Sequence, residues 1–374
     1  MSSNDLTAQN TAESVPFEQL RSMVESEFPV EDSFVEYGVP TFYIAQQVGS
    51  KKAFLRLLNR LEPIGFVPVL RRRDEKTVLQ AVPRPPTKPS RQLINIALLF
   101  ATLATVLFAG YLQSVVFYSE LGVTDQVQYV VGAVMFAGAI MAILGSHEMG
   151  HKLAADRHGV EATYPYFIPG PPPIGTFGAV IQQKSLPPNK DALFDLGSAG
   201  PIVGFLVAIA VSVIGIRLSS YTWISEGAPT LPISPLFLLI MQYIHPSGVI
   251  PPMPGSEYLL AVSPHPVAFA GWIGMIVTVL NLIPVGMFDG GHIAETFLGK
   301  TARRVVSYIA ILAFLAFGFF SGWEPFIIWA LIAIFFSFMR HPGPLDNASE
   351  VATWRKLATL GVAAVFFLSF PFIF

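Results

Sequence analysis

The chain has 374 residues, of which 52% are hydrophobic and only 13% are charged, and its formal net charge is −2. Because soluble domains carry about 25% charged residues, this composition excludes an ordinary soluble protein and predicts a polytopic membrane protein. The near-neutral charge favours no nucleic-acid partner, and the absence of cysteine excludes disulfide bonds and Cys-ligated metals.

The first part of the chain is richer in charged residues than the rest. We expect residues 1–15 to form a disordered tail without signal-peptide features, residues 16–82 a small cytosolic α+β domain, and residues 83–91 a Pro-rich linker. Three arginines at 71–73 could suggest nucleic acid, but a solvated turn facing anionic lipid headgroups is the simpler interpretation. The apolar spacing within the domain predicts two helices and three strands: 16–27 and 51–61, then 41–45, 66–70 and 77–82.

The remainder of the chain contains seven segments that approach the roughly 20 apolar residues needed to cross a bilayer. These segments are residues 93–116, 127–155, 193–218, 267–283, 305–320, 325–338 and 357–374. Residues 231–244 are also apolar but contain two prolines, so we expect a re-entrant or interfacial segment there. The predicted fold is a polytopic α-helical membrane protein with about seven transmembrane helices. Its core would span 92–345, and 346–374 would form the C-terminal transmembrane helix.

The distribution of lysine and arginine predicts the orientation of these segments. Both residues occur before the first segment and after the second, fourth and sixth, whereas the loops 117–126, 219–264 and 321–324 contain neither. By the positive-inside rule, the N-terminal domain is cytosolic and the C-terminus lies outside. We expect a multi-pass protein of a prokaryotic cell membrane.

The second segment ends in the motif HEMGH at residues 147–151. His147 and His151 are one helical turn apart, so both imidazoles leave the same helix face and can supply two ligands of a catalytic zinc. Glu148 follows the first histidine and can act as general base without being a ligand. A structural cluster of polar side chains is the alternative, and we disfavour it because uncompensated ionisable groups in lipid are costly.

A third ligand is expected at the same depth, at the end of the fourth segment. Asp289 supplies a carboxylate there, although it could instead cap a helix beginning at Gly290. Asn281 can donate to a developing oxyanion, or it can form an interhelical hydrogen bond. His292 is either a partner of a metal ligand or a surface histidine.

The loop after HEMGH is apolar and rich in proline and glycine, so we expect a re-entrant β-hairpin-like loop rather than a helix. An unpaired strand in this loop could bind an unwound substrate by edge addition. The alternative is a loop that only packs over the helices. The predicted substrate-binding residues are Phe177, Gly178, Ala179, Val180 and Ile181.

HEMGH together with the later run NLIPVGMFDG resembles the site-2 protease family of intramembrane zinc metalloproteases, and GTFGA at 175–179 is closest to its EGY-type branch of plastids, cyanobacteria and archaea. The resemblance implies one zinc ion per chain, held by His147, His151 and Asp289, with Glu148 as catalytic base and Asn281 as oxyanion or substrate contact. It also implies membrane-protein substrates with transmembrane helices. Nothing in the chain resembles the PDZ or CBS domains that some relatives carry.

Two other functions remain open as alternatives. A membrane metal-ion transporter would distribute ionisable residues through several spans, but the other predicted spans contain almost none. A proteolytically inactive scaffold is disfavoured because Glu148 and all three predicted ligands are present. The sequence predicts no oligomeric state.

Overall fold

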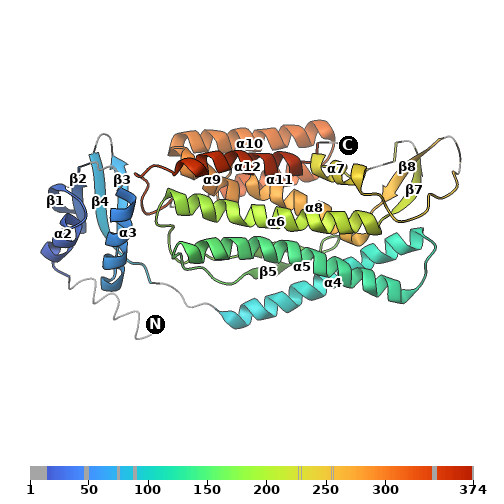
Figure 1. Cartoon of the computed structure of the whole chain (residues 1–374), viewed down its shortest axis with the longest axis horizontal. Coiled ribbons are helices and arrows are strands. Elements are labelled where there is room, and N and C mark those ends of the chain that lie inside the picture. Colours follow the sequence, from blue (N-terminus) through green and yellow to red (C-terminus); the bar gives the residue numbers. More distant parts are fainter. Residues whose placement is uncertain are drawn as a thin grey trace.

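A computed structural model describes residues 15–45, 50–73, 76–86, 91–225, 227–228, 230–253, 255, 257–338 and 343–372. The expected disordered tail lies outside the described residues except for its last position. The molecule has a small α+β unit at one end of an elongated helical bundle (Figure 1).

The small unit, residues 15–86, is a four-stranded antiparallel sheet covered by two helices. Its strand order is β1-β2-β4-β3, and the side chains of α2 and α3 pack with one face of this sheet in a single buried core. The elements are α2 (Phe17–Glu25), β1 (Val30–Glu36), β2 (Val39–Ile44), α3 (Ser50–Leu61), β3 (Phe66–Arg73) and β4 (Lys76–Pro83).

Most of these elements were predicted, with two corrections. Strand β1 was missed because its sequence VEDSFVE is acidic and lacks the alternation of a half-buried strand. The arginines at 71–73 end strand β3 and are not in a turn. Arg71 is half-buried, and its Nη1 donates to the carbonyl of Leu345, 2.7 Å away.

The described part of the chain contains four helices long and apolar enough to cross a membrane. They correspond to the first, second, third and fifth predicted spans: α4 (Gln92–Glu120), α5 (Gln126–Arg157), α6 (Lys190–Leu218) and α10 (Lys300–Ser321). The other three predicted spans form shorter helices: α8 (Pro266–Leu282), α11 (Pro325–Ser337) and α12 (Thr353–Ser369). The 17 residues of α8 extend only about 26 Å, less than the roughly 30 Å of a hydrocarbon core.

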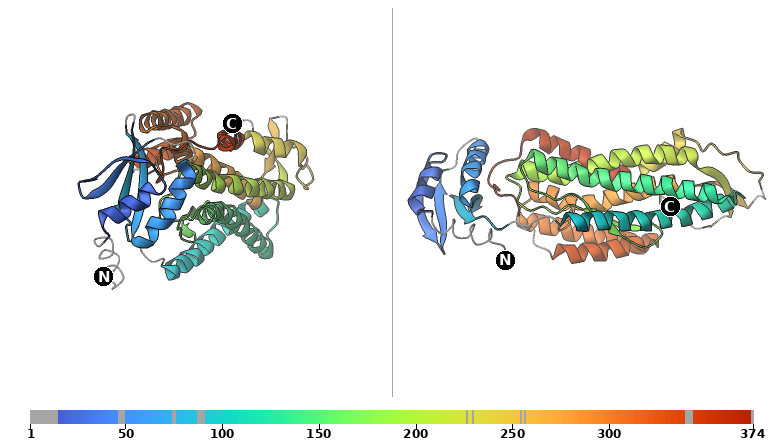
Figure 2. Two further views of the ribbon diagram at one scale, coloured as in Figure 1. Left: turned by 60° about the vertical axis from the view of Figure 1, so that its left-hand side comes forward. Right: turned by 90° about the horizontal axis from the view of Figure 1, so that it is seen from below.

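The helices of the bundle lie side by side and alternate in direction (Figures 1 and 2). Polar side chains fix where three of them begin: Asp125 accepts from the backbone of α5, Asn189 from α6 and His265 from α8. Helices α5 and α6 pack unusually closely, because a Cβ added at Gly150 would lie 2.8 Å from the carbonyl oxygen of Ala199.

A short hairpin follows α5 and runs back along the bundle. It pairs β5 (Tyr166–Pro169) with β6 (Thr176–Val180) in antiparallel fashion. The Oγ1 of Thr105, near the middle of α4, donates to the carbonyl of Gly175 in the turn of the hairpin, 2.7 Å away. The expected hairpin-like loop is therefore present, but its strand is not unpaired, since β5 occupies one edge.

The opposite end of the bundle from the α+β unit carries a second small sheet (Figure 1). Strands β7 (Ser220–Ser225) and β8 (Tyr258–Ser263) pair there, and neither was predicted. Helix α7 (Pro235–Tyr243) lies between them in sequence, within the segment 231–244 expected to be re-entrant or interfacial, and has nine residues.

Candidate active site

Helix α5 brings three polar side chains into the interior of the bundle. His147, Glu148 and His151 are 4%, 7% and 8% exposed. The Nε2 atoms of the two histidines lie 3.0 Å apart, as expected for side chains one helical turn apart on one face. Residues 130–144 of α5 are entirely apolar, so these polar groups lie near the end of a helix whose composition is otherwise suited to crossing a membrane.

Asp289 completes a three-residue cluster from a distant part of the sequence. It is the first residue of α9 (Asp289–Phe297), and its Oδ2 lies 3.3 Å from the Nε2 atoms of both His147 and His151. Ligand atoms of a tetrahedral zinc with bonds of 2.0–2.1 Å are about 3.3 Å apart. Two imidazoles and one carboxylate at this spacing therefore fit a zinc ion and leave its fourth position open.

A tight backbone turn carries the chain from α8 to Asp289. Pro284 follows the end of α8, and Gly286 has a φ of +50°, a conformation that favours glycine. Gly290 and Gly291 pack directly against backbone carbonyls of the same turn, where a Cβ would clash. The glycines after Asp289 thus allow the chain to fold back and hold the carboxylate against α5.

Helix α6 supports the two histidines from the other side. The Nδ1 of His151 lies 2.6 Å from the carbonyl oxygen of Leu196, and a proton on Nδ1 leaves Nε2 free to bind a metal. Gly200 faces the same ring so closely that an added Cβ would overlap His151 Nε2, and a Cβ at Gly204 would lie 3.1 Å from the His147 ring. These roles were not predicted from the sequence, and the small residues of SAGP at 198–201 are the signal that could have indicated them.

The remaining predicted site residues lie around this cluster. The Nδ2 of Asn281, in the last turn of α8, is 3.2 Å from His147 Nε2. The backbone N–H of Ile181 donates to the Glu148 carboxylate, so the end of the hairpin reaches the cluster. Phe177 and Val180 are 73% and 50% exposed.

The structure also decides between the alternatives that the sequence left open for His292 and for the helix cap at Asp289. His292 is partly buried and packs against Gly197 of α6, so it is not a surface histidine. Asp289 begins α9 itself, and the residue in the capping position is Phe288. Of the predicted set, the structure brings together six residues: His147, Glu148, His151, Asn281, Asp289 and, through its backbone N–H, Ile181.

Comparisons with known proteins find several plant proteins that are similar to this chain. The chain is 32% identical over 242 residues to the probable zinc metalloprotease EGY1, chloroplastic, of Arabidopsis thaliana, which covers 63% of this chain and 42% of that protein. It is 30% identical over 258 residues to the probable zinc metallopeptidase EGY3, chloroplastic, of Arabidopsis thaliana. That match covers 65% of this chain and 44% of the relative. It is 27% identical over 347 residues to the probable zinc metalloprotease EGY2, chloroplastic, of Oryza sativa subsp. indica. That match covers 86% of this chain and 60% of the relative.

The chain spans less than half the length of the EGY1 protein that it matches. No solved structure matches it significantly. The sequence profile of peptidase family M50 matches residues 135–322, which is just over half of the 374 residues and includes the whole metal cluster. The chain therefore belongs to peptidase family M50.

Proposed function

We propose that this protein is an intramembrane zinc metalloprotease that hydrolyses peptide bonds in or near transmembrane segments of other membrane proteins. The observation that carries this proposal is the cluster of His147, His151 and Asp289 at zinc-ligand spacing, with Glu148 beside it, on a helix suited to crossing a membrane. The names of the relatives as zinc metalloproteases support it. A metal-ion transporter is not favoured, since this is the one such cluster among the described residues.

The proposed roles follow from the position of each group. A bound zinc supplies Lewis-acid activation of water and of the scissile carbonyl. Glu148 takes a proton on its carboxylate and returns it to the leaving amine, and the Ile181 N–H holds that carboxylate in place. Asn281 lies close enough to the cluster to donate its amide hydrogen to the carbonyl oxygen as negative charge develops there.

We further propose that the open edge of β6 binds the unwound substrate chain. The N–H of Ile181 points away from β5 toward Glu148, whereas the carbonyl of Gln182 accepts from Thr163 on the β5 side. Because backbone groups alternate along a strand, the N–H and C=O of Ala179 share the side of Ile181. Ala179 is thus the residue of the predicted strand whose backbone would pair with a substrate, whereas the alternation breaks at Phe177, where the register shifts and Gly178 has a φ of +106°.

Replacing Ala179 by proline should lower kcat/KM by a few-fold to about tenfold, because proline removes one donor worth about 0.5–1.5 kcal/mol. Zinc content should be unchanged, since no proposed ligand lies in the hairpin. The measurement is cleavage of a single-span substrate in detergent, with Ala179→Gly as the control that keeps the N–H. Equal activity of the two variants would show that β6 only packs against the bundle.

The orientation and the seven-span topology are part of the proposal. We infer that the α+β unit, proposed as a domain over 16–82, faces the cytosol, that 83–91 links it to a core over 92–345, and that 346–374 crosses last. The relatives named above are chloroplastic, and a prokaryotic cell membrane stays a prediction from the sequence. Lipid and membrane-protein substrates are the proposed partners.

Single cysteines test this orientation, because the chain has none of its own. Ser247→Cys, exposed near β7, should react with an impermeant thiol reagent added outside intact cells. Ser185→Cys, at the base of the hairpin, should react only after the membrane is permeabilised. The reverse labelling pattern would overturn the orientation and the cytosolic placement of the active site.

A further inference from the structure

The segment between α11 and α12 joins the α+β unit to the bundle through backbone hydrogen bonds on both sides. The N–H of Leu70 donates to Leu345 and the N–H of Asn347 donates to Leu70, over 2.9 and 3.1 Å, so this segment extends the edge of β3. On its other side, the N–H groups of Leu345 and Asp346 donate to the carbonyls of Pro187 and Pro188, over 2.8 and 3.0 Å. Residues 345–347 therefore form a bridging segment, joined by isolated β-bridges to Leu70 of β3 and to Asn189 at the start of α6.

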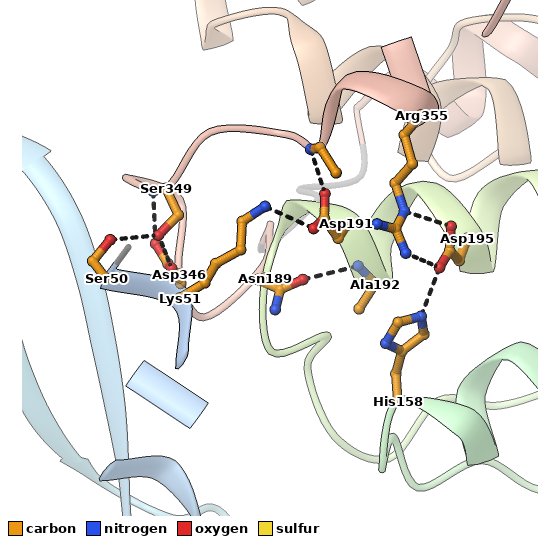
Figure 3. Close-up of polar contacts among 11 residues, drawn as sticks. Ser50, Lys51, His158, Asn189, Asp191, Ala192, Asp195, Asp346, Ser349 and Arg355 are labelled. Carbon is orange, nitrogen blue, oxygen red and sulfur yellow. Dashed lines mark hydrogen bonds and ion pairs between the residues drawn. The ribbon is translucent and has the colours of Figure 1, made fainter. Parts of the chain in front are cut away.

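The side chain of Asp346 fixes the bend that follows this bridging segment. Asp346 is fully buried, and its carboxylate accepts from the backbone N–H and the hydroxyl of Ser349. The Oγ of Ser349 lies 2.9 Å from the Oγ of Ser50, the first residue of α3 (Figure 3). The bend thus contacts the α+β unit a second time.

A third contact is an ion pair centred on Asp191 in the first turn of α6 (Figure 3). Lys51 of α3 places its Nζ 2.7 Å from Asp191 Oδ2, and both side chains are largely buried. Asp191 also accepts from the backbone N–H of Ala352 and lies 3.2 Å from the guanidinium of Arg355. A partly desolvated carboxylate with three donors is held more firmly than an exposed surface pair.

The first two turns of α6 lead from this contact to the metal cluster. Asp195, one turn after Asp191, accepts from Arg355 of α12 and from His158 at the end of α5, both over 2.8 Å. The next residue, Leu196, provides the carbonyl that binds the Nδ1 of His151. A short chain of contacts therefore runs from Lys51 through the first two turns of α6 to His151, a proposed metal ligand.

We propose that the α+β unit is a positioning element of the active site. This unit is docked through Lys51 and the bridging segment 345–347. It thereby fixes the first two turns of α6 and hence the Leu196 carbonyl that orients the His151 ring. Asp191 is the positioning residue that receives this contact. The inference rests on the metalloprotease function proposed above, and it explains why the unit contacts the bundle at several places, among them also the ion pair of Arg84 with Glu161.

The test uses the full chain with Lys51→Glu and Asn347→Pro combined. The first change opposes Asp191 with a like charge, and the second removes the N–H that binds Leu70. Zinc should be released to a chelator about threefold to tenfold faster, and kcat should fall by a similar factor with KM nearly constant. The matched control is Lys52→Glu with Asn347→Ala, which makes the same charge change at an exposed neighbour and keeps the backbone N–H.

A disulfide provides the rescue. Ser50→Cys with Ser349→Cys, added to the double variant, should form the chain's single disulfide when oxidised, because the two hydroxyls are 2.9 Å apart. Oxidation should restore slow zinc release, and reduction should abolish the restoration. Zinc release from the double variant at the wild-type rate would overturn the proposal. Zinc release is measured without substrate, so absence of proteolysis in the wild type would instead refute the proposed function.

Discussion

Replacing Glu148 by glutamine is expected to leave zinc bound and to reduce peptide hydrolysis by about a hundredfold to ten-thousandfold, the range that a general base contributes. Glutamine has nearly the same shape, and its carbonyl oxygen can still accept from the Ile181 N–H. It cannot take a proton from water at neutral pH. The measurement is cleavage of a single-span membrane substrate in detergent, with and without a zinc chelator, together with metal analysis of the purified variant.

The ligand variants are the counterpart to this experiment. His147→Ala, His151→Ala and Asp289→Ala each remove one of three donors from a cluster with 3.0–3.3 Å spacing, so each should lose both the zinc and the activity. Wild-type protein should hold about one zinc per chain. Full metal retention by Asp289→Ala would refute the third ligand, and near-normal turnover by Glu148→Gln would refute the base.

The metal cluster could be predicted from sequence because its geometry is mostly local. His147, Glu148 and His151 lie within two turns of one helix, where helical periodicity alone determines their relative positions. Asp289 is far away in sequence, but alternating spans place the ends of the second and fourth segments at the same end of the bundle. A breaker such as Pro284 then marks where the fourth helix stops.

The support around the cluster could not be predicted, because it depends on how helices cross. The contact of Leu196 with His151 exists only because α5 and α6 approach closely at Gly150 and Gly200. One sequence does not specify which glycines face a neighbouring helix. The fourth segment was predicted at 267–283 and forms a helix of the same length, Pro266–Leu282, which is shorter than a bilayer core.

Contacts between distant segments were missed for lack of any local signal. Residues 345–347 follow Pro344 in an irregular segment, and their partner Leu70 is more than 270 positions earlier. Strand β5 was missed because it ends in the proline-rich run around its turn, so β6 was predicted without its partner. Edge pairing of this kind is set by the assembled fold and not by the pattern of one segment.

Replacing Gly200 by alanine is expected to abolish zinc binding and proteolysis without removing any ligand. A methyl group at this position would overlap the His151 Nε2, the atom that must reach the metal. The neighbouring atoms cannot yield easily, since Gly200 also packs against the backbone of α5 at Gly150. The ring would therefore turn away from Asp289, and the two remaining donors would hold zinc only weakly.

Two further glycines make this expectation quantitative. At Gly204 an added Cβ would lie 3.1 Å from the His147 ring, so a shift of a few tenths of an ångström would relieve it and zinc binding should weaken only partly. At Gly138 of α5 an added methyl would meet no described atom within 4 Å, and Gly138→Ala should stabilise the helix by about 0.5–1 kcal/mol without altering zinc content. Metal analysis should therefore find full zinc content in Gly138→Ala, reduced zinc content in Gly204→Ala and no zinc in Gly200→Ala. Normal zinc content in Gly200→Ala would mean that the packing of α6 against the His151 ring is looser than this structure shows.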